Sequence, residues 1–234
     1  MNIIITGASS GVGFEAVLDI ILSGEHKVIA LARSENKLGR LSEIAQGLNP
    51  DCSLFPIAFD LVHDDYSGLL QFIAERFDNR VDTLVNNAGM LINKPFMDLG
   101  ETDFVEMLQS NFIGHVRIIQ NLLPLMPANA HIVNIGSMGG FQGSAKFPGL
   151  SAYSASKAAL HTLTECLAQE LTERQIKVNC LALGSVQTEM LEEAFPGYQS
   201  PVLAFEMGKY VADFALTGHK FFNGKILPVA ISTP

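Results

Sequence analysis

The chain has 234 residues, a length that suits one α/β domain better than two separate cores. It is 48% hydrophobic and only 17% charged, so a large buried core is available and wholesale disorder is excluded. Its 15 Lys and Arg residues against 24 Asp and Glu residues leave a net charge of −9. A chain this acidic would repel phosphate backbones, which argues against nucleic acid as its partner.

Short β-branched segments alternate with longer helical patterns along the chain. The expected strands cover residues 2–6, 27–32, 53–59, 83–85, 131–135, 178–183 and 225–231. The expected helices cover residues 11–23, 35–46, 66–77, 102–123, 153–174 and about 200–218. Because the strands are apolar without alternation, we expect them to be buried on both faces. The pattern predicts a doubly wound, Rossmann-like parallel sheet of about seven strands, in one domain spanning 1–234.

Two of the expected helices carry apolar stripes. We expect Thr102 to cap the helix over 102–123, with an inner stripe of Phe104, Leu108 and Phe112. On the helix over 153–174, the buried side is expected at Leu160, Leu163, Leu167 and Leu171.

The start of the chain and its cysteines favour a cytoplasmic protein. The first residues have no basic segment and reach a turn at Gly7, so they do not resemble a signal peptide. The uncharged stretch 118–145 is broken by Asn, Pro and Gly, which argues against a membrane span. Cys52, Cys166 and Cys180 have no metal-ligand spacing, and we expect buried thiols and no metal site.

A glycine-rich segment lies between the first strand and the first helix. It reads TGASSGVG over residues 6–13. Glycines there let the backbone approach a pyrophosphate, whose charge meets the free N–H groups of a helix N-terminus. An ordinary glycine-rich turn is the alternative, and the place of the segment after the first strand favours the phosphate site.

Further polar residues follow later strands or share a helix face. Tyr153 and Lys157 lie one helical turn apart, where an ammonium favours the phenolate and would lower the tyrosine pKa. Ser137 directly follows a strand and could donate a hydrogen bond to a substrate carbonyl. Asn111 is unusual inside a helix, although a solvent-facing position would also explain it.

The order of these signals resembles the short-chain dehydrogenase/reductase family. The segments that carry the resemblance are TGASSGVG (6–13), NNAG (86–89), Asn111, Ser137 and YSASK (153–157), with Asp60, NCLALG (179–184) and Thr188 extending it. It covers essentially the whole chain and implies an oxidoreductase that uses a nicotinamide cofactor and a small carbonyl or alcohol substrate.

The resemblance also implies a role for each residue. The implied catalytic residues are Asn111, Ser137, Tyr153 and Lys157. Tyr153 would exchange the proton, Ser137 would polarise the substrate oxygen, and Lys157 would bind the ribose. Asn111 would hold a water that links Lys157 to solvent. The implied cofactor-binding residues are Gly7, Ser9, Ser10, Gly11, Val12, Gly13, Arg33, Ser34, Asp60, Leu61, Asn87, Ala88, Gly89, Tyr153, Lys157, Gly184, Val186 and Thr188.

The end of the second strand indicates which dinucleotide is used. NAD-binding chains carry an acidic residue there, which would repel the 2′-phosphate of NADP. This chain has Arg33 and Ser34 instead, and a guanidinium can bind phosphate. We therefore favour NADP(H), with NAD(H) as the alternative if Arg33 is an ordinary surface residue.

The chain departs from the family pattern at three places. Leu183 stands where the family usually has proline, the stretch between Ser137 and Tyr153 is longer than is common, and the segment over 185–199 is short. That segment is either an apolar lid over the substrate or a plain surface helix.

Three readings of function remain. The first is a short-chain carbonyl reductase or alcohol dehydrogenase; the second is a non-catalytic dinucleotide-binding regulator. A sugar-nucleotide epimerase or dehydratase is disfavoured, because the region after the sixth strand is too short for a substrate lobe. The resemblance also implies a homodimer or homotetramer formed through the helices at 102–123 and 153–174.

Overall fold

A computed structural model of the protein describes residues 1–231, so residues 232–234 of the expected domain lie outside the described residues. All pairings in its sheet are parallel, and the strand order is β3-β2-β1-β4-β5-β6-β7. The strands are β1 (Asn2–Thr6), β2 (Lys27–Ala32), β3 (Ser53–Ala58), β4 (Thr83–Asn86), β5 (His131–Ser137), β6 (Lys177–Leu183) and β7 (Ile226–Val229). This confirms the predicted doubly wound, Rossmann-like sheet. The strand order reverses between β1 and β4, the point where such sheets bind ligands.

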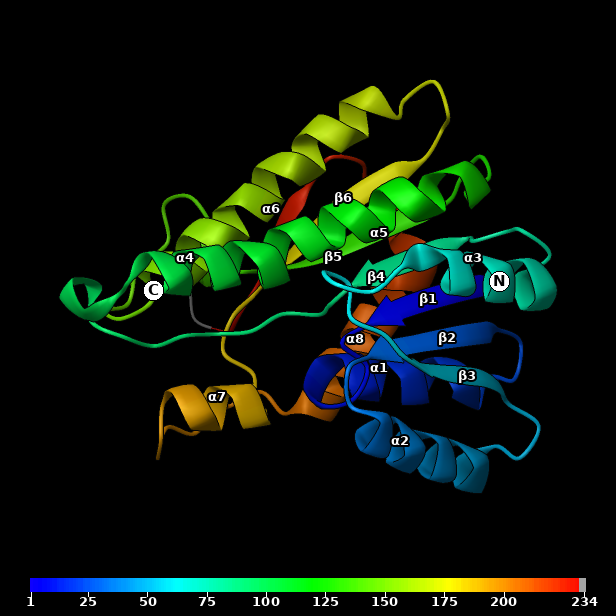
Figure 1. The fold of residues 1–234 in the computed structure, drawn as a ribbon, viewed down its shortest axis with the longest axis horizontal. Coiled ribbons are helices and arrows are strands. Elements are labelled where there is room, and N and C mark those ends of the chain that lie inside the picture. The colour runs from blue at the N-terminus through cyan, green and yellow to red at the C-terminus, as the bar shows by residue number, and fades with distance from the viewer. Residues whose placement is uncertain (232–234) are drawn as a thin grey trace.

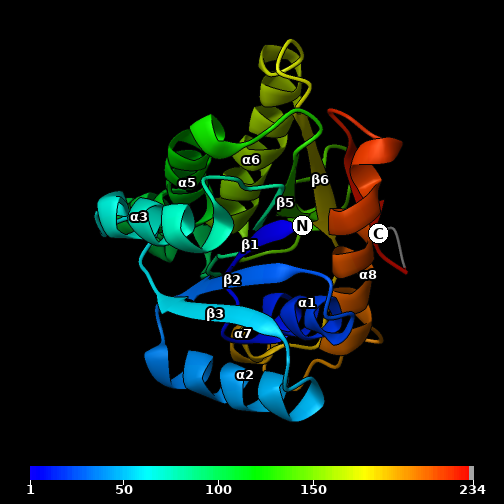
Figure 2. The ribbon, with the colours of Figure 1, turned by 90° about the vertical axis from the view of Figure 1, so that its right-hand side faces the viewer.

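The helices cover both faces of the sheet (Figures 1 and 2). They are α1 (Gly11–Leu22), α2 (Glu35–Leu48), α3 (Tyr66–Phe77), α4 (Glu101–Leu108), α5 (Gly114–Leu122), α6 (Ser151–Glu170), α7 (Glu189–Ala194) and α8 (Ala204–Thr217). Figure 2 shows α1, α2 and α8 on one face and α3, α5 and α6 on the other. Figure 1 shows α7 apart from both layers, beyond the carboxyl ends of the strands.

Strand β1 shows why the sheet must be covered twice. Ile3, Ile4 and Ile5 are all fully buried, and successive side chains of a strand point to opposite faces. Ile3 and Ile5 therefore join the core under α1 and α8, whereas Ile4 joins the core under α3 and α5. Neither core could form without helices on its own side.

The predicted helix over 102–123 differs from the structure in its start and its inner face. Gly100, not Thr102, is the N-cap, and a π-helical turn over Gln109–Ile113 separates α4 from α5. The predicted stripe is wrong: Leu108 is exposed, and Phe104 and Phe112 are only partly buried. The buried positions are Met107, Asn111, Gly114, His115, Ile118, Ile119 and Leu122. The apolar residues of the predicted stripe therefore lie on a face of the helix that does not pack on the sheet.

The inner face of α6 is more polar than predicted. Leu160 and Leu171 are buried as expected, but Leu163 and Leu167 are only partly buried. The fully or nearly fully buried polar positions of the helix are Ser156, Lys157, His161 and Thr164. The predicted burial of the cysteines holds for Cys180; Cys52 is partly buried and Cys166 is exposed, and all three are free thiols.

The remaining boundaries differ by a few residues at element ends. The predicted helix at about 200 begins at Ala204, and the predicted helix over 153–174 runs over Ser151–Glu170. Within the described residues, no helix is both long enough and apolar enough to span a bilayer.

Candidate active site

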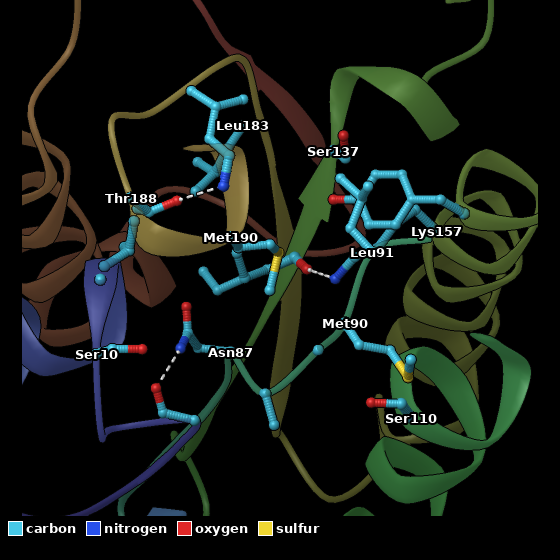
Figure 3. A pocket seen from close by; sticks show the side chains of 18 of the residues that line it. Ser10, Asn87, Met90, Leu91, Ser110, Ser137, Lys157, Leu183, Thr188 and Met190 are labelled. Carbon is cyan, nitrogen blue, oxygen red and sulfur yellow. Dashed lines mark hydrogen bonds between the residues drawn. The ribbon is translucent and has the colours of Figure 1, made fainter. Parts of the chain in front are cut away.

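A cavity of about 1250 Å³ opens at the carboxyl ends of the strands. It exceeds the roughly 300–1,000 Å³ of most ligand pockets, so it has room for more than one small molecule. Its walls come from the loops that follow β1 to β6, from α4 and from α7 (Figure 3). This is the edge of the sheet at which ligands of doubly wound folds bind.

The cavity brings together almost all of the side chains predicted to act there. Those that line it are Gly7, Ser9, Ser10, Gly11, Val12, Arg33, Ser34, Asp60, Leu61, Asn87, Ala88, Gly89, Ser137, Tyr153, Lys157, Gly184, Val186 and Thr188. Gly13 and Asn111 do not line it. Both lie behind its wall, where they pack against lining segments.

The glycine turn has two separate structural requirements. Gly7 and Gly11 have φ angles of +65° and +58°, which favour glycine. Gly13 is required by contact instead: a Cβ there would lie 2.3 Å from the Asn87 side-chain nitrogen and 2.5 Å from the Gly7 carbonyl oxygen. Asn87 uses that nitrogen to donate hydrogen bonds to the carbonyls of Thr6 and Gly7. Gly13 therefore lets the turn close against the end of β4.

Gly13→Ala is expected to destabilise the protein by about 1–3 kcal/mol, because the added methyl group has no space and its neighbours include backbone. The matched control is Gly39→Ala in α2, where a Cβ would meet nothing within 4 Å. That control should raise stability by about 0.5–1 kcal/mol. Urea unfolding of both variants measures the difference. Equal effects would show that the contact at Gly13 is unimportant.

The first turn of α1 leaves its N–H groups available to a ligand. Its N-cap residue Ser10 makes no side-chain capping bond, and Ser10, Gly11 and Val12 all line the cavity. The first N–H groups of a helix have no partner within the helix and carry its positive dipole end. The arrangement can therefore bind an anionic group such as a phosphate.

Tyr153, Lys157 and Ser137 lie together at the other side of the cavity. The Lys157 ammonium is 6.0 Å from the centre of the Tyr153 ring and donates a hydrogen bond of 2.9 Å to the carbonyl of Ile135. The Ser137 hydroxyl accepts a hydrogen bond of 3.0 Å from the N–H of Gly139. All three line the cavity, and Figure 3 shows Ser137 and Lys157 on the side of it away from Ser10.

Burial determines the charges of this group. It lowers the pKa of Lys157 to about 8, because the side chain is only 4% exposed. It raises the pKa of Tyr153, while the nearby Ser137 acts in the opposite direction. The sequence predicted that Lys157 would lower the tyrosine pKa, and the structure does not bear this out. The phenolate is desolvated, so Tyr153 is a neutral hydroxyl that can donate a proton.

Asn111 lies within the π-helical turn and is fully buried, which excludes the solvent-facing alternative. Its side-chain oxygen accepts from the N–H of Met90 at 2.8 Å, and its side-chain nitrogen donates to the carbonyl of Met90 at 3.0 Å. The same nitrogen lies 3.0 Å from the Ser156 hydroxyl. Asn111 thus fixes the segment after β4 against α6. π turns are frequent at functional sites.

The sequence reasoning missed His115, which lies one turn after Asn111. This imidazole is fully buried, and its Nε2 atom is 2.8 Å from the carbonyl oxygen of Ala88. Burial and the nearby Lys157 lower its pKa to about 3, so it is neutral. A neutral imidazole that bonds a carbonyl carries its hydrogen on Nε2. The sequence feature that could have identified His115 is its position four residues after Asn111, on the same face of the helix.

The opposite end of the cavity holds the charged residues that follow β2 and β3. Arg33 is exposed, and Ser34 caps α2 by accepting from the N–H of Lys37. Lys37 also lines the cavity and forms an ion pair with Glu189, the first residue of α7. The Asp60 carboxylate accepts from the N–H of Val62 at 2.8 Å. The end of β2 thus presents the Arg33 guanidinium to the cavity, whereas the Lys37 ammonium is paired with the Glu189 carboxylate.

Helix α7 closes the cavity from outside, within the segment over 185–199. Thr188 caps it by accepting from the N–H of Leu191, and Met190, Leu191 and Phe195 line the cavity. Its first residue is held by Lys37, and its last residue, Ala194, accepts a hydrogen bond of 2.7 Å from Asn93. The segment therefore contributes to the lining of the cavity, and its role as a lid over the substrate stays a prediction.

A doubly wound sheet with a glycine turn, an open helix start and a buried Tyr–Lys pair at one edge defines a dinucleotide-dependent oxidoreductase of the Rossmann type. The chain belongs to the short chain dehydrogenase family, whose sequence pattern matches residues 1–199. This confirms the family predicted from the sequence. The family uses a dinucleotide of the NAD(P) type.

Individual relatives agree with this assignment. The chain is 31% identical over 223 residues to an uncharacterized oxidoreductase of Staphylococcus epidermidis, covering 94% of this chain and 92% of that protein. It is 35% identical over 193 residues to a fatty acyl-CoA reductase of Acinetobacter baylyi, covering 80% of this chain. The match spans 63% of that reductase, less than two thirds of its length. A crystal structure of a dehydrogenase/reductase from Sinorhizobium meliloti has a TM-score of 0.83 and 26% identity, covering 98% of this chain and 93% of that one.

Proposed function

We propose that the protein is an NADP(H)-dependent oxidoreductase that interconverts a carbonyl compound and its alcohol, with Tyr153 as the proton donor or acceptor. The observation that carries the proposal is that Tyr153, Ser137 and Lys157 line the same cavity as the open start of α1. This supports the proposal, because a helix start suited to phosphate and a hydroxyl suited to proton donation share one enclosure. The Acinetobacter relative, a fatty acyl-CoA reductase, supports a carbonyl compound as the substrate class.

The residues present fit a dinucleotide. The N–H groups at the start of α1 would hold the pyrophosphate beside Gly7 and Gly11, where a side chain has no space or no suitable φ angle. Asp60 would lie beside the adenine, and Thr188 near the carboxamide. Asn87 and Ala88 would border the adenosine ribose.

When bound, the nicotinamide supplies the hydride that reduces the carbonyl carbon. Tyr153 donates its proton to the carbonyl oxygen as charge develops there, and takes one back when an alcohol is oxidised. Ser137 donates a hydrogen bond to the same oxygen. Lys157 would bind the ribose, and Asn111, which lies behind the cavity wall, would hold the water through which the proton is replaced. The raised pKa of Tyr153 suits the reductive direction, because the hydroxyl is protonated at neutral pH.

The choice of NADP(H) rests on Arg33, which lines the cavity at the end of β2. Arg33→Ala is expected to weaken NADPH binding about 10–100-fold, because a charge-assisted hydrogen bond to the 2′-phosphate contributes about 1.5–3 kcal/mol. NADH binding should change little. Arg40→Ala on the exposed side of α2 is the matched control. Calorimetric titration measures the affinity of each protein for NADPH and for NADH, and tighter binding of NADH by the unchanged protein would contradict the choice.

The alternative is a dinucleotide-binding regulator without turnover. Binding of NADPH with no reduction of any carbonyl compound would favour it, whereas turnover that disappears in Tyr153→Phe would support the oxidoreductase. The buried position of Lys157 beside Tyr153 favours catalysis, because binding a dinucleotide does not require a proton donor. A homodimer or homotetramer is also proposed, since Val105, Leu108 and Ile113 expose apolar surface on α4 and the turn that follows it.

A further inference from the structure

The cavity is divided by charge into two unlike ends. The end near β2 and β3 carries Arg33, Lys37 and Asp60. The lining outside that end includes six large apolar residues, namely Met90, Met138, Met190, Leu91, Leu150 and Phe195. Each of the three methionines comes from a different segment, and Figure 3 shows Met190 and Leu91 projecting into the enclosure. Methionine adapts its shape to apolar ligands.

Hydrogen bonds tie the segments of the apolar end to one another. Asn93 donates to the carbonyl of Ala194 at the end of α7, and the N–H of Lys94 donates 3.0 Å to the carbonyl of Gly149. Gly149 has a φ angle of +86°, and a Cβ there would lie 2.0 Å from the Asn93 oxygen. The apolar end is therefore built by contacts within the protein, and a ligand need not organise it. Preorganisation of this kind favours binding.

Once a dinucleotide is bound, the apolar end offers a carboxylate no free partner. Two charged residues line this side among the described residues: Glu106 of α4 is acidic, and the Lys157 ammonium donates to the carbonyl of Ile135 and would bind the ribose. Two further lysines lie next to this wall along the chain: Lys94 is paired with Asp103 at 2.9 Å, and Lys146 donates to the carbonyl of Phe141 and the hydroxyl of Ser144. An acidic substrate would lose water and meet a like charge, which costs several kcal/mol when no partner replaces the water.

Resting on the proposed function, we propose that the substrate is an uncharged carbonyl compound with an extended apolar body, or the corresponding alcohol. The carbonyl carbon lies at Tyr153 and Ser137, and the apolar body lies between α7 and the segments that carry Met90 and Leu150. Reduction adds a hydride to the carbonyl carbon and the Tyr153 proton to its oxygen, so that an aldehyde or ketone becomes an alcohol and NADPH becomes NADP⁺.

The test compares aldehydes from butanal to decanal with a decanal that ends in a carboxylate, using NADPH and following loss of its absorbance. We expect kcat/KM to rise up to about fourfold for each added methylene that is buried. We expect decanal to exceed its carboxylate analogue about 100-fold. Glu106→Gln should reduce the ratio of kcat/KM for decanal to kcat/KM for its carboxylate analogue. Met190→Ser should reduce the increase of kcat/KM with chain length. Met97→Ser changes an exposed methionine outside the cavity, and as the control it should leave both quantities unchanged.

The outcomes separate this proposal from the proposed function. Preference for the carboxylate analogue, or a kcat/KM that does not rise with chain length, would overturn the substrate class and leave the oxidoreductase in place. Bound NADPH without turnover of any compound would overturn both. An unchanged ratio in Glu106→Gln would show that this residue does not set the selectivity against acids.

Discussion

Replacing Tyr153 by Phe is expected to lower kcat about 10²–10⁴-fold, the usual contribution of a positioned general acid. Dinucleotide affinity should fall by about tenfold at most, because the change removes one hydroxyl and its hydrogen bond. The phenyl ring keeps the contact with Lys157, so the site retains its shape. Steady-state kinetics give kcat, and calorimetric titration with NADPH gives the affinity.

Tyr210→Phe is the matched control for this experiment. Tyr210 is partly exposed on α8 and does not line the cavity, so the loss of its hydroxyl should leave kcat within about twofold of the unchanged protein. Turnover that survives in Tyr153→Phe would remove Tyr153 as the proton donor. A loss of NADPH binding equal to the loss of kcat would mean that the tyrosine acts by holding the cofactor.

The sequence was sufficient to predict the sheet and most of the lining of the cavity. Unbroken apolar strands such as Asn2–Thr6 and Lys27–Ala32 have one explanation, burial on both faces, and this fixes the doubly wound arrangement. Residues directly after such strands must then meet at one edge. Ser137 and Asn87 were found in this way, because their positions depend on the backbone and not on side-chain packing.

Properties that depend on packing between distant segments could not be predicted. The pKa of Tyr153 is set by how completely the surrounding loops desolvate it, and the spacing from Lys157 does not report this. Leu108 has the apolar character of a core residue but faces outward. Gly13 fits the phosphate pattern, yet its structural requirement comes from Asn87, more than 70 residues away along the chain.

Acidification is expected to destabilise the protein steeply between pH 6.5 and about 4. Burial lowers the pKa of His115 to about 3 and the pKa values of His131 and His161 to about 4. The folded protein therefore keeps these imidazoles neutral, whereas the unfolded chain protonates them below about 6.5. Because the unfolded state binds more protons in this window, the free energy of unfolding falls as the pH falls. Each histidine contributes a slope of about 1 kcal/mol per pH unit.

Urea unfolding at intervals from pH 7 to pH 4.5 measures that slope, and variants assign it. His161→Asn and His115→Asn each remove one titrating group, so each should reduce the slope by about 1 kcal/mol per pH unit, whatever its effect on stability at pH 7. Carboxylates add a slope of the same sign, but the variants leave these groups in place and their contribution cancels in the comparison. A slope unchanged in both variants would mean that the two imidazoles can be protonated without unfolding. Protonation of His115 would then require the cavity wall to open, because the His115 Nε2 atom bonds the carbonyl of Ala88 inside that wall.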